Sequence, residues 1–167
     1  MYIPFDSLPG YSRIWIYPAN RVITPVEKNY LSSGLKKLCE QWSAHNTPLH
    51  TSFLIALDYF IILGVDEQKN GASGCSIDSS VHFLKSLQQE AGIDFFDRSQ
   101  VSFLQDSTIS QFPRTELKTL FENRTLSADT ITFNNSVTTK SDWESHWQEP
   151  VRTSWLARYL PKTTVAH

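Results

Sequence analysis

The feature that most constrains the fold is an apolar run from Leu49 to Val65, rich in β-branched and aromatic residues. The run is too long for one ordinary strand, and Leu57-Asp58 at its middle predicts a turn between two antiparallel strands. Asp58 tolerates the left-handed conformation that such a turn requires. Because Asp58 also interrupts the apolar run, the run falls short of the about 18 residues of a membrane helix, and we expect a soluble protein.

A second constraint is a helix start at Thr24-Pro25-Val26-Glu27. It combines an N-cap, a proline at the first helical position and a glutamate at the third, which together predict the first turn of a helix. The other predicted elements around the hairpin follow from hydrophobic periodicity and from breakers such as Gly92. They are a strand at Arg13–Tyr17, a helix from Pro25 to about Ala44, a helix from about Asp78 to Ala91 and a strand at Gln100–Leu104.

The order strand, helix, strand, strand, helix, strand predicts an α+β fold with a ferredoxin-like split βαβ (βαββαβ) core. We expect a single domain over residues 1–167, with the core at about 11–106 and a C-terminal extension of helices and a strand at 107–167. Both sheet faces are apolar, so the face without helices needs cover from the extension or from a dimer partner. The aromatic residues available in the extension are Phe121, Phe133, Trp143, Trp147 and Trp155. Any of these tryptophans that stays exposed would instead mark an interface.

Composition narrows the class of protein. The chain of 167 residues has two cysteines, too few for a disulfide framework, and its start has no signal-peptide pattern, so we expect a cytoplasmic location. The net charge is −2 and the pI is about 6.2, with scattered lysines and arginines. This distribution predicts neither a nucleic-acid partner nor a membrane partner.

The predicted topology gathers several chemically active segments at one end of the sheet. These are the entry at Arg13, the turn at His45, the loop from Asp66 to Asp78 and the exit at Asp106. The loop is rich in small residues and precedes a helix N-terminus, where backbone amides and hydroxyls suit a phosphate or a carboxylate. The residues predicted to bind such a ligand are Gly71, Ser73, Gly74, Ser76, Asp78, Arg13 and Asp106.

The same end also supports a catalytic interpretation. Cys75 close to a helix N-terminus can form a thiolate, His45 can take its proton, and an acid such as Asp66, Glu67 or Asp106 can orient the imidazole. The alternative is that Cys75 is a packed thiol and that Asp78 caps the helix. A metal site at His45, Cys75 and Asp66 or Asp106 lacks the close-spaced ligand pairs of structural zinc, so we expect no metal and no cofactor.

Three stretches resemble a family of uncharacterised bacterial proteins of similar length, some of which are labelled ABC transporter ATPases. They are Trp42-Ser-Ala-His45, Ser73-Gly-Cys-Ser-Ile-Asp-Ser-Ser80 and Phe96-Asp97-Arg98. The resemblance implies a small soluble bacterial protein. The sequence contains neither the Walker lysine nor the Leu-Ser-Gly-Gly-Gln stretch of such ATPases.

These observations predict a cytoplasmic small-molecule or anion-binding or regulatory protein that uses the Gly/Ser/Cys loop. The alternative is a cysteine-nucleophile enzyme, with Cys75 and His45 acting on an acyl or similar electrophile. A third class is a dimeric interaction module that pairs through the sheet face or the C-terminal segment.

Overall fold

The computed structural model describes residues 1–44, 47–67 and 74–162, and the side chains of residues 43, 44, 47 and 74–76 lie outside this description. The chain is α+β and forms two compact units. Unit 1 comprises Met1–Asp97 and Asn135–Ser145, and unit 2 comprises Arg98–Asn134 and His146–His167. No helix in the described part of the chain is long and apolar enough to cross a membrane.

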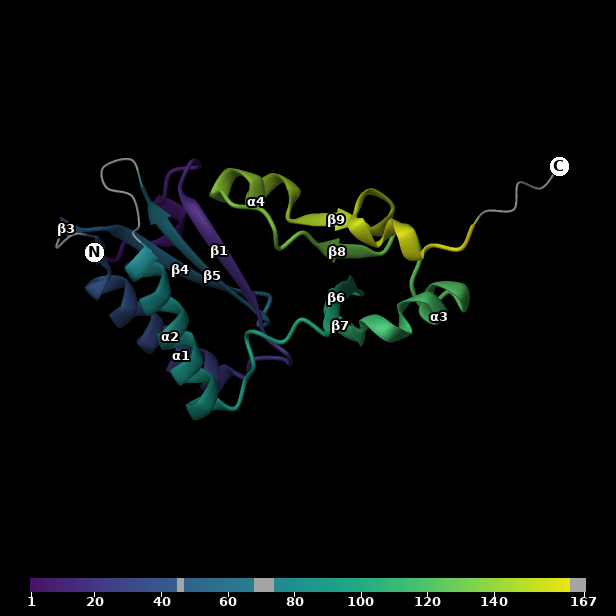
Figure 1. The fold of residues 1–167 in the computed structure, drawn as a ribbon, viewed down its shortest axis with the longest axis horizontal. Helices are drawn as coiled ribbons and strands as arrows, with labels where there is room; N and C mark the ends of the chain where they lie inside the picture. The colour runs from purple at the N-terminus through teal and green to yellow at the C-terminus, as the bar shows by residue number, and fades with distance from the viewer. Residues whose placement is uncertain (45–46, 68–73, 163–167) are drawn as a thin grey trace. The chain divides into compact units, whose positions relative to one another are not determined.

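Unit 1 contains most of the predicted core elements together with several short ones that were not predicted. In chain order its elements are η1 (Phe5–Ser7), β1 (Arg13–Pro18), α1 (Pro25–Gln41), β2 (Ser43–Ala44), β3 (Thr47–Pro48), β4 (His50–Ala56), β5 (Phe60–Asp66), α2 (Gly74–Ala91) and most of α4 (Lys140–His146). Strands β1, β5 and β4 form an antiparallel sheet in that order (Figure 1). The predicted hairpin is confirmed, because the chain reverses at Leu57 and Asp58, both with positive φ.

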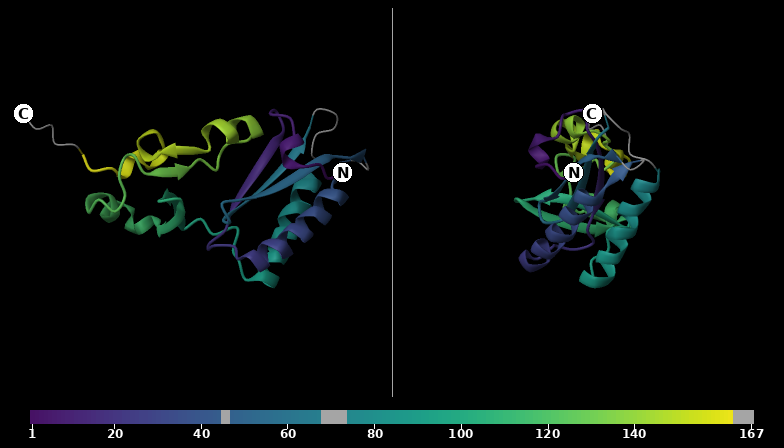
Figure 2. Two further views of the ribbon diagram at one scale, coloured as in Figure 1. Left: turned by 180° about the vertical axis from the view of Figure 1, so that it is seen from behind. Right: turned by 90° about the vertical axis from the view of Figure 1, so that its left-hand side faces the viewer.

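Helices α1 and α2 lie side by side on one face of this sheet, as Figures 1 and 2 show. The predicted capping box of α1 is confirmed: the Glu27 amide donates to Thr24 Oγ1 at 3.3 Å, and the Thr24 amide donates to Glu27 Oε1 at 3.1 Å. Leu31 and Leu35 of α1 and Leu84 of α2 are fully buried in the core beneath the helices. This burial stabilises the helices through their apolar stripes.

The predicted helix boundaries need two corrections. Helix α1 ends at Gln41 rather than near Ala44, because Ser43 and Ala44 pair with β3. Helix α2 begins at Gly74, four residues before the predicted start at Asp78, and ends as predicted before Gly92, which has a φ of 70°. Gly74, Cys75 and Ser76 therefore belong to the first turn of a helix rather than to a loop.

The second face of the sheet is covered partly by the N-terminal segment. A Cβ atom at Gly64 would lie 2.5 Å from Leu8 Cδ1, so the glycine leaves room for Leu8 to pack on the strand. Phe5 packs nearby and makes an edge contact with the Trp143 ring at 5.5 Å. The Lys140 ammonium, almost fully buried, donates to the carbonyl oxygen of Leu8 at 2.7 Å and fastens this cover to α4.

Unit 2 is built on a second antiparallel sheet, ordered β7-β6-β8-β9. Buried Phe103, Phe121 and Leu156 contribute to a core of its own. Strand β6 is the predicted fourth strand, whereas β7 and β9 were not predicted. The elements are β6 (Gln100–Gln105), β7 (Thr108–Pro113), η2 (Arg114–Glu116), α3 (Leu117–Glu122), β8 (Ile131–Phe133), β9 (Gln148–Pro150), η3 (Val151–Thr153) and η4 (Trp155–Tyr159).

The strand order does not confirm a ferredoxin-like sheet. In that arrangement the fourth strand would pair with the outer edge of β1, but β6 pairs with β7 and β8 in unit 2. At the outer edge of β1, the Ile14 amide instead donates to the Thr138 carbonyl oxygen at 2.9 Å, and Arg13 forms a bridge with Thr139. The segment that returns from unit 2 thus occupies part of the edge expected for β6.

Candidate functional site

Two of the predicted site residues, Arg13 and Asp66, do lie at the same end of the sheet in unit 1. Arg13 opens β1 opposite Val65, so Asp66 and Glu67 follow directly at the end of β5. The Tyr11 hydroxyl donates to Asp66 Oδ2 at 3.4 Å, and Arg13 Nη1 lies 3.7 Å from Glu67 Oε1. Partial desolvation and the Asp66 carboxylate raise the pKa of Tyr11. Both predicted residues are therefore already in contact with neighbouring side chains.

Arg13 also contacts a tryptophan ring, which packs against a second one. The Arg13 guanidinium lies 4.9 Å from the centroid of the Trp15 ring, and the Trp15 and Trp42 centroids are 6.0 Å apart. Trp42 is only 5% exposed and belongs to the core. The Arg13 guanidinium contacts both the Trp15 ring and the Glu67 carboxylate. Its positive charge is therefore balanced by a negative one within unit 1.

The described residues give no support for grouping the remaining predicted residues with Arg13 and Asp66. Asp78 is exposed in the second turn of α2. Asp106 belongs to unit 2, where it forms the turn between β6 and β7 with a φ of 50°, so the strand order gives no support for placing it beside Arg13. His45, Gly71 and Ser73 lie outside the described residues, as do the side chains of Gly74, Cys75 and Ser76. The proposed roles of these six residues stay predictions.

Cys39, the other cysteine, is a free thiol buried in α1. Burial raises its pKa to about 11, so the thiolate needed for nucleophilic attack does not form near neutral pH. Within residues 1–44, 47–67 and 74–162, no group of three His, Cys, Asp or Glu side chains is placed to hold a metal ion.

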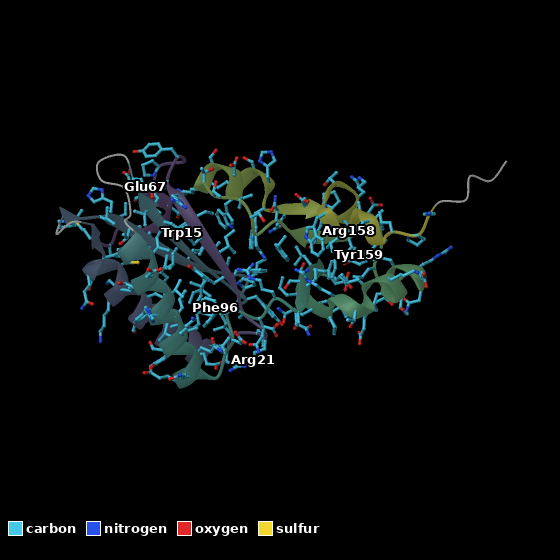
Figure 3. The ribbon with its side chains drawn as sticks, viewed as in Figure 1. Trp15, Arg21, Glu67, Phe96, Arg158 and Tyr159 are labelled. Atoms are coloured by element: carbon cyan, nitrogen blue, oxygen red, sulfur yellow. The ribbon has the colours of Figure 1, made fainter. Side chains whose placement is uncertain are left out.

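A group of side chains in unit 2 combines an exposed aromatic ring with two guanidinium groups. Trp155 is 42% exposed, although most tryptophans of the chain contribute to packing. The guanidinium carbons of Arg114 and Arg158 lie 5.0 and 5.5 Å from the centroid of its ring. The Tyr159 ring meets Trp155 edge-on at 6.1 Å. We refer to Arg114, Trp155, Arg158 and Tyr159 as the Trp155 cluster; Figure 3 marks Arg158 and Tyr159 in η4.

The backbone around the Trp155 cluster is held firmly. Leu156, next to Trp155, is fully buried in the core of unit 2, and its amide donates to the Ser154 hydroxyl at 3.1 Å. Arg158 Nε donates to the carbonyl oxygen of Trp155 at 3.2 Å, which keeps this guanidinium beside the ring. The Arg114 amide donates to the Ser99 carbonyl oxygen at 3.0 Å, where β7 ends. The cluster is therefore largely preorganised, because little backbone freedom remains to be lost on binding.

The electrostatics of the cluster differ from those of the arginines that form ion pairs. Among the described residues, neither Arg114 nor Arg158 has a carboxylate at ion-pair distance, whereas Arg152 in the same unit pairs with Asp129. The charge of the chain is also unevenly divided. Unit 1 carries eight Lys and Arg against twelve Asp and Glu, and unit 2 carries seven against five. Arg114 and Arg158 thus lie in the unit with the positive balance.

Sequence reasoning did not predict the Trp155 cluster as a site. The interaction of Arg114 with the ring of Trp155 depends on the fold of unit 2, which places the end of β7 beside η4. One signal was available, namely that a tail tryptophan left exposed would mark an interface. Trp155 fulfils that condition, whereas Trp143 packs on Phe5 and Trp147 packs on Phe133.

Comparison of this chain with protein-family models, with curated proteins and with solved structures gives no match. A functional assignment therefore depends on the chemistry of the residues described above.

Proposed function

We propose that this protein is a binding protein for anionic groups and that the Trp155 cluster makes the contact. The observation that carries the proposal is that two guanidinium groups lie over one exposed indole ring, with no carboxylate partner among the described residues. An anion bound at the cluster accepts charge-assisted hydrogen bonds from the guanidinium donors, which are the stronger kind of hydrogen bond.

Anion binding is the function predicted from the Gly/Ser/Cys loop, but the supporting residues are different ones. Arginine is well suited to carboxylates and phosphates, because its planar fork of donors matches two anionic oxygens at once. The indole adds an apolar surface beside the charge, which favours a ligand that carries both an anionic and an apolar part. A contribution of the loop from Gly71 to Ser80 to the same function remains a prediction.

We also propose that unit 1 is a ferredoxin-like arrangement without its fourth strand. The support is the order β1-β5-β4, the two helices on one face, and the segment at Thr138 and Thr139 on the outer edge of β1. A cytoplasmic location belongs to the same proposal. It is supported by the low cysteine content and by the free thiol of Cys39.

The proposal is tested by calorimetric titration of citrate, a tricarboxylate, into the protein at constant ionic strength. We expect weak saturable binding to the natural sequence and a loss of affinity of at least about tenfold in the double variant R114Q/R158Q, since charge-assisted hydrogen bonds contribute roughly 1.5 kcal/mol or more each. The matched control is R152Q, which removes the same charge from the same unit but at a guanidinium that already has a carboxylate partner.

Binding that is equally weakened by R152Q would show a general charge effect and would contradict the role of the Trp155 cluster. The same conclusion follows if citrate gives no more heat than chloride at equal ionic strength. Thermal unfolding of each variant checks that the exposed substitutions leave unit 2 folded.

A further inference from the structure

We infer that the anionic ligand of the Trp155 cluster is an extended acidic segment of another protein. In this interaction, Asp or Glu carboxylates of the partner bind the guanidinium groups of Arg114 and Arg158, and an apolar side chain between them packs on the ring of Trp155. The inference rests on the proposed function, because it names the partner of the same site.

Exposure of the cluster favours a macromolecular partner over a small anion. Arg114, Trp155 and Arg158 are all exposed. A small ion on such a surface stays hydrated on most sides, and salt screens its attraction to the arginines. An extended segment can contact both arginines and the indole together, so that each contact lowers the entropic cost of the next.

The residue types match those that dominate the energetics of protein interfaces. Trp, Tyr and Arg are the side chains most enriched among interface hot spots, and all four members of the cluster are of these types. The ring of Trp155 stays accessible because Leu156 turns inward and anchors η4 in the core. An exposed aromatic ring with two cations beside it therefore offers an apolar contact next to charged ones.

The charges near the cluster favour an acidic peptide over a nucleic acid. A nucleic-acid backbone is bound by a track of several cations, each of which neutralises a phosphate. Here two guanidinium groups are grouped, the exposed carboxylate of Glu116 follows Arg114 by two residues, and unit 2 has an excess of only two positive charges. Carboxylates spaced along a peptide fit this small cationic group better than a continuous line of phosphates.

The test compares four fluorescently labelled probes by anisotropy with the full chain. The first is a peptide of eight glutamates around a central phenylalanine; the second replaces the phenylalanine with alanine, and the third replaces the glutamates with glutamines. The fourth is an oligothymidylate with eight phosphates. We expect the first peptide to bind most tightly, the alanine peptide to bind several-fold more weakly, and the glutamine peptide to bind at least tenfold more weakly.

Variants of the protein show which residues bind the peptide. R114Q/R158Q and W155A should each weaken the first peptide at least tenfold, whereas R152Q should leave its affinity within about twofold, because its pair with Asp129 is separate from the ring. If W155A lowers the melting temperature, W155F replaces it, since phenylalanine keeps an apolar ring but is a weaker partner for a cation.

Three results would overturn the inference. Tighter binding of the oligothymidylate would assign a nucleic acid as the partner. If citrate binds at the Trp155 cluster and the glutamate peptides bind no more tightly than citrate, the proposed function stands. An acidic protein segment is then ruled out as the ligand. Absence of binding by citrate and by every peptide would contradict both the inference and the function on which it rests.

Discussion

Two tryptophans of this protein lie beside guanidinium groups, one in each unit, and their surroundings differ. In unit 1, Arg13 lies over Trp15, but its charge is balanced by Glu67 and the ring packs toward the buried Trp42. In unit 2, the exposed ring of Trp155 has two guanidinium groups and no carboxylate at ion-pair distance in the described structure.

This difference shows that the same residue types can stabilise a fold or recognise a ligand. Where a carboxylate and a buried neighbour complete the group, the interactions are satisfied within the protein. Where charge and aromatic surface are left exposed, the favourable interactions are still to be made with a partner. Two predictions test whether the two tryptophan regions differ in this way, and a third measures an arginine whose charge is fully paired.

The largest effect is expected from removing the buried ring behind Trp15. Trp42→Ala should lower the free energy of unfolding by about 3–5 kcal/mol, because a large core side chain is replaced by a cavity. Trp155→Ala should change it by less than about 1 kcal/mol, because the ring is partly exposed. Denaturant titration followed by circular dichroism measures both. Equal losses would mean that Trp155 is as much a part of the core as Trp42.

An intermediate effect is expected at Arg21, a guanidinium that is fully paired. Arg21 donates to both carboxylate oxygens of Glu27 at 2.8 and 2.6 Å, which lowers the Glu27 pKa from 4.5 to about 2. Since the pKa is lower in the folded state, this stabilisation is present above about pH 4.5 and is lost as the pH falls toward 2. After allowance for solvent screening we expect it to contribute about 1 kcal/mol.

Acid unfolding of E27Q and R21Q measures this contribution. Each variant should be less stable than the natural sequence at neutral pH, and the difference should vanish between pH 4.5 and 2, where Glu27 becomes protonated. An E27Q protein with the acid profile of the natural sequence would contradict the coupling.

The smallest effect separates the arginines of the two tryptophan regions. Arg13→Gln should destabilise the protein by about 0.5 kcal/mol, because it removes a partly exposed ion pair with Glu67. Arg114→Gln should be nearly neutral, because it removes only an exposed contact with the ring and no ion pair among the described residues. Thermal unfolding at low salt distinguishes the stabilities of the two variants, and high salt should reduce the difference between them. A clear destabilisation by Arg114→Gln would indicate a structural ion pair.

Local sequence signals predicted the parts of unit 1 that depend on local interactions. The capping box at Thr24 and Glu27, the turn at Leu57 and Asp58, and the helix end before Gly92 are all present. Each depends on a few consecutive residues whose backbone preferences agree with the final structure. The start of α2 was missed by four residues, since Gly74 and Cys75 carry no helix-start signal of their own.

Pairing between distant segments was not predictable in the same way. Strand β6 was predicted, but its partners were not, because the Asp106-Ser107 turn has no glycine and β7 ends in Pro113. Because β7 was not predicted, β1 was the remaining strand with which β6 was expected to pair. The Trp155 cluster was missed for the same reason, since its Arg114 follows the unpredicted strand.

The most direct test of the difference between the two tryptophan regions is the shift of each indole N–H signal in a ¹⁵N–¹H correlation spectrum as citrate is added. Variants W155F and W15F assign the two signals among those of the five tryptophans. We predict that the Trp155 signal moves saturably with citrate, that the Trp15 signal stays in place, and that R114Q/R158Q abolishes the movement. A saturable shift of Trp15 with Trp155 unchanged would contradict this account and place the anion site in unit 1.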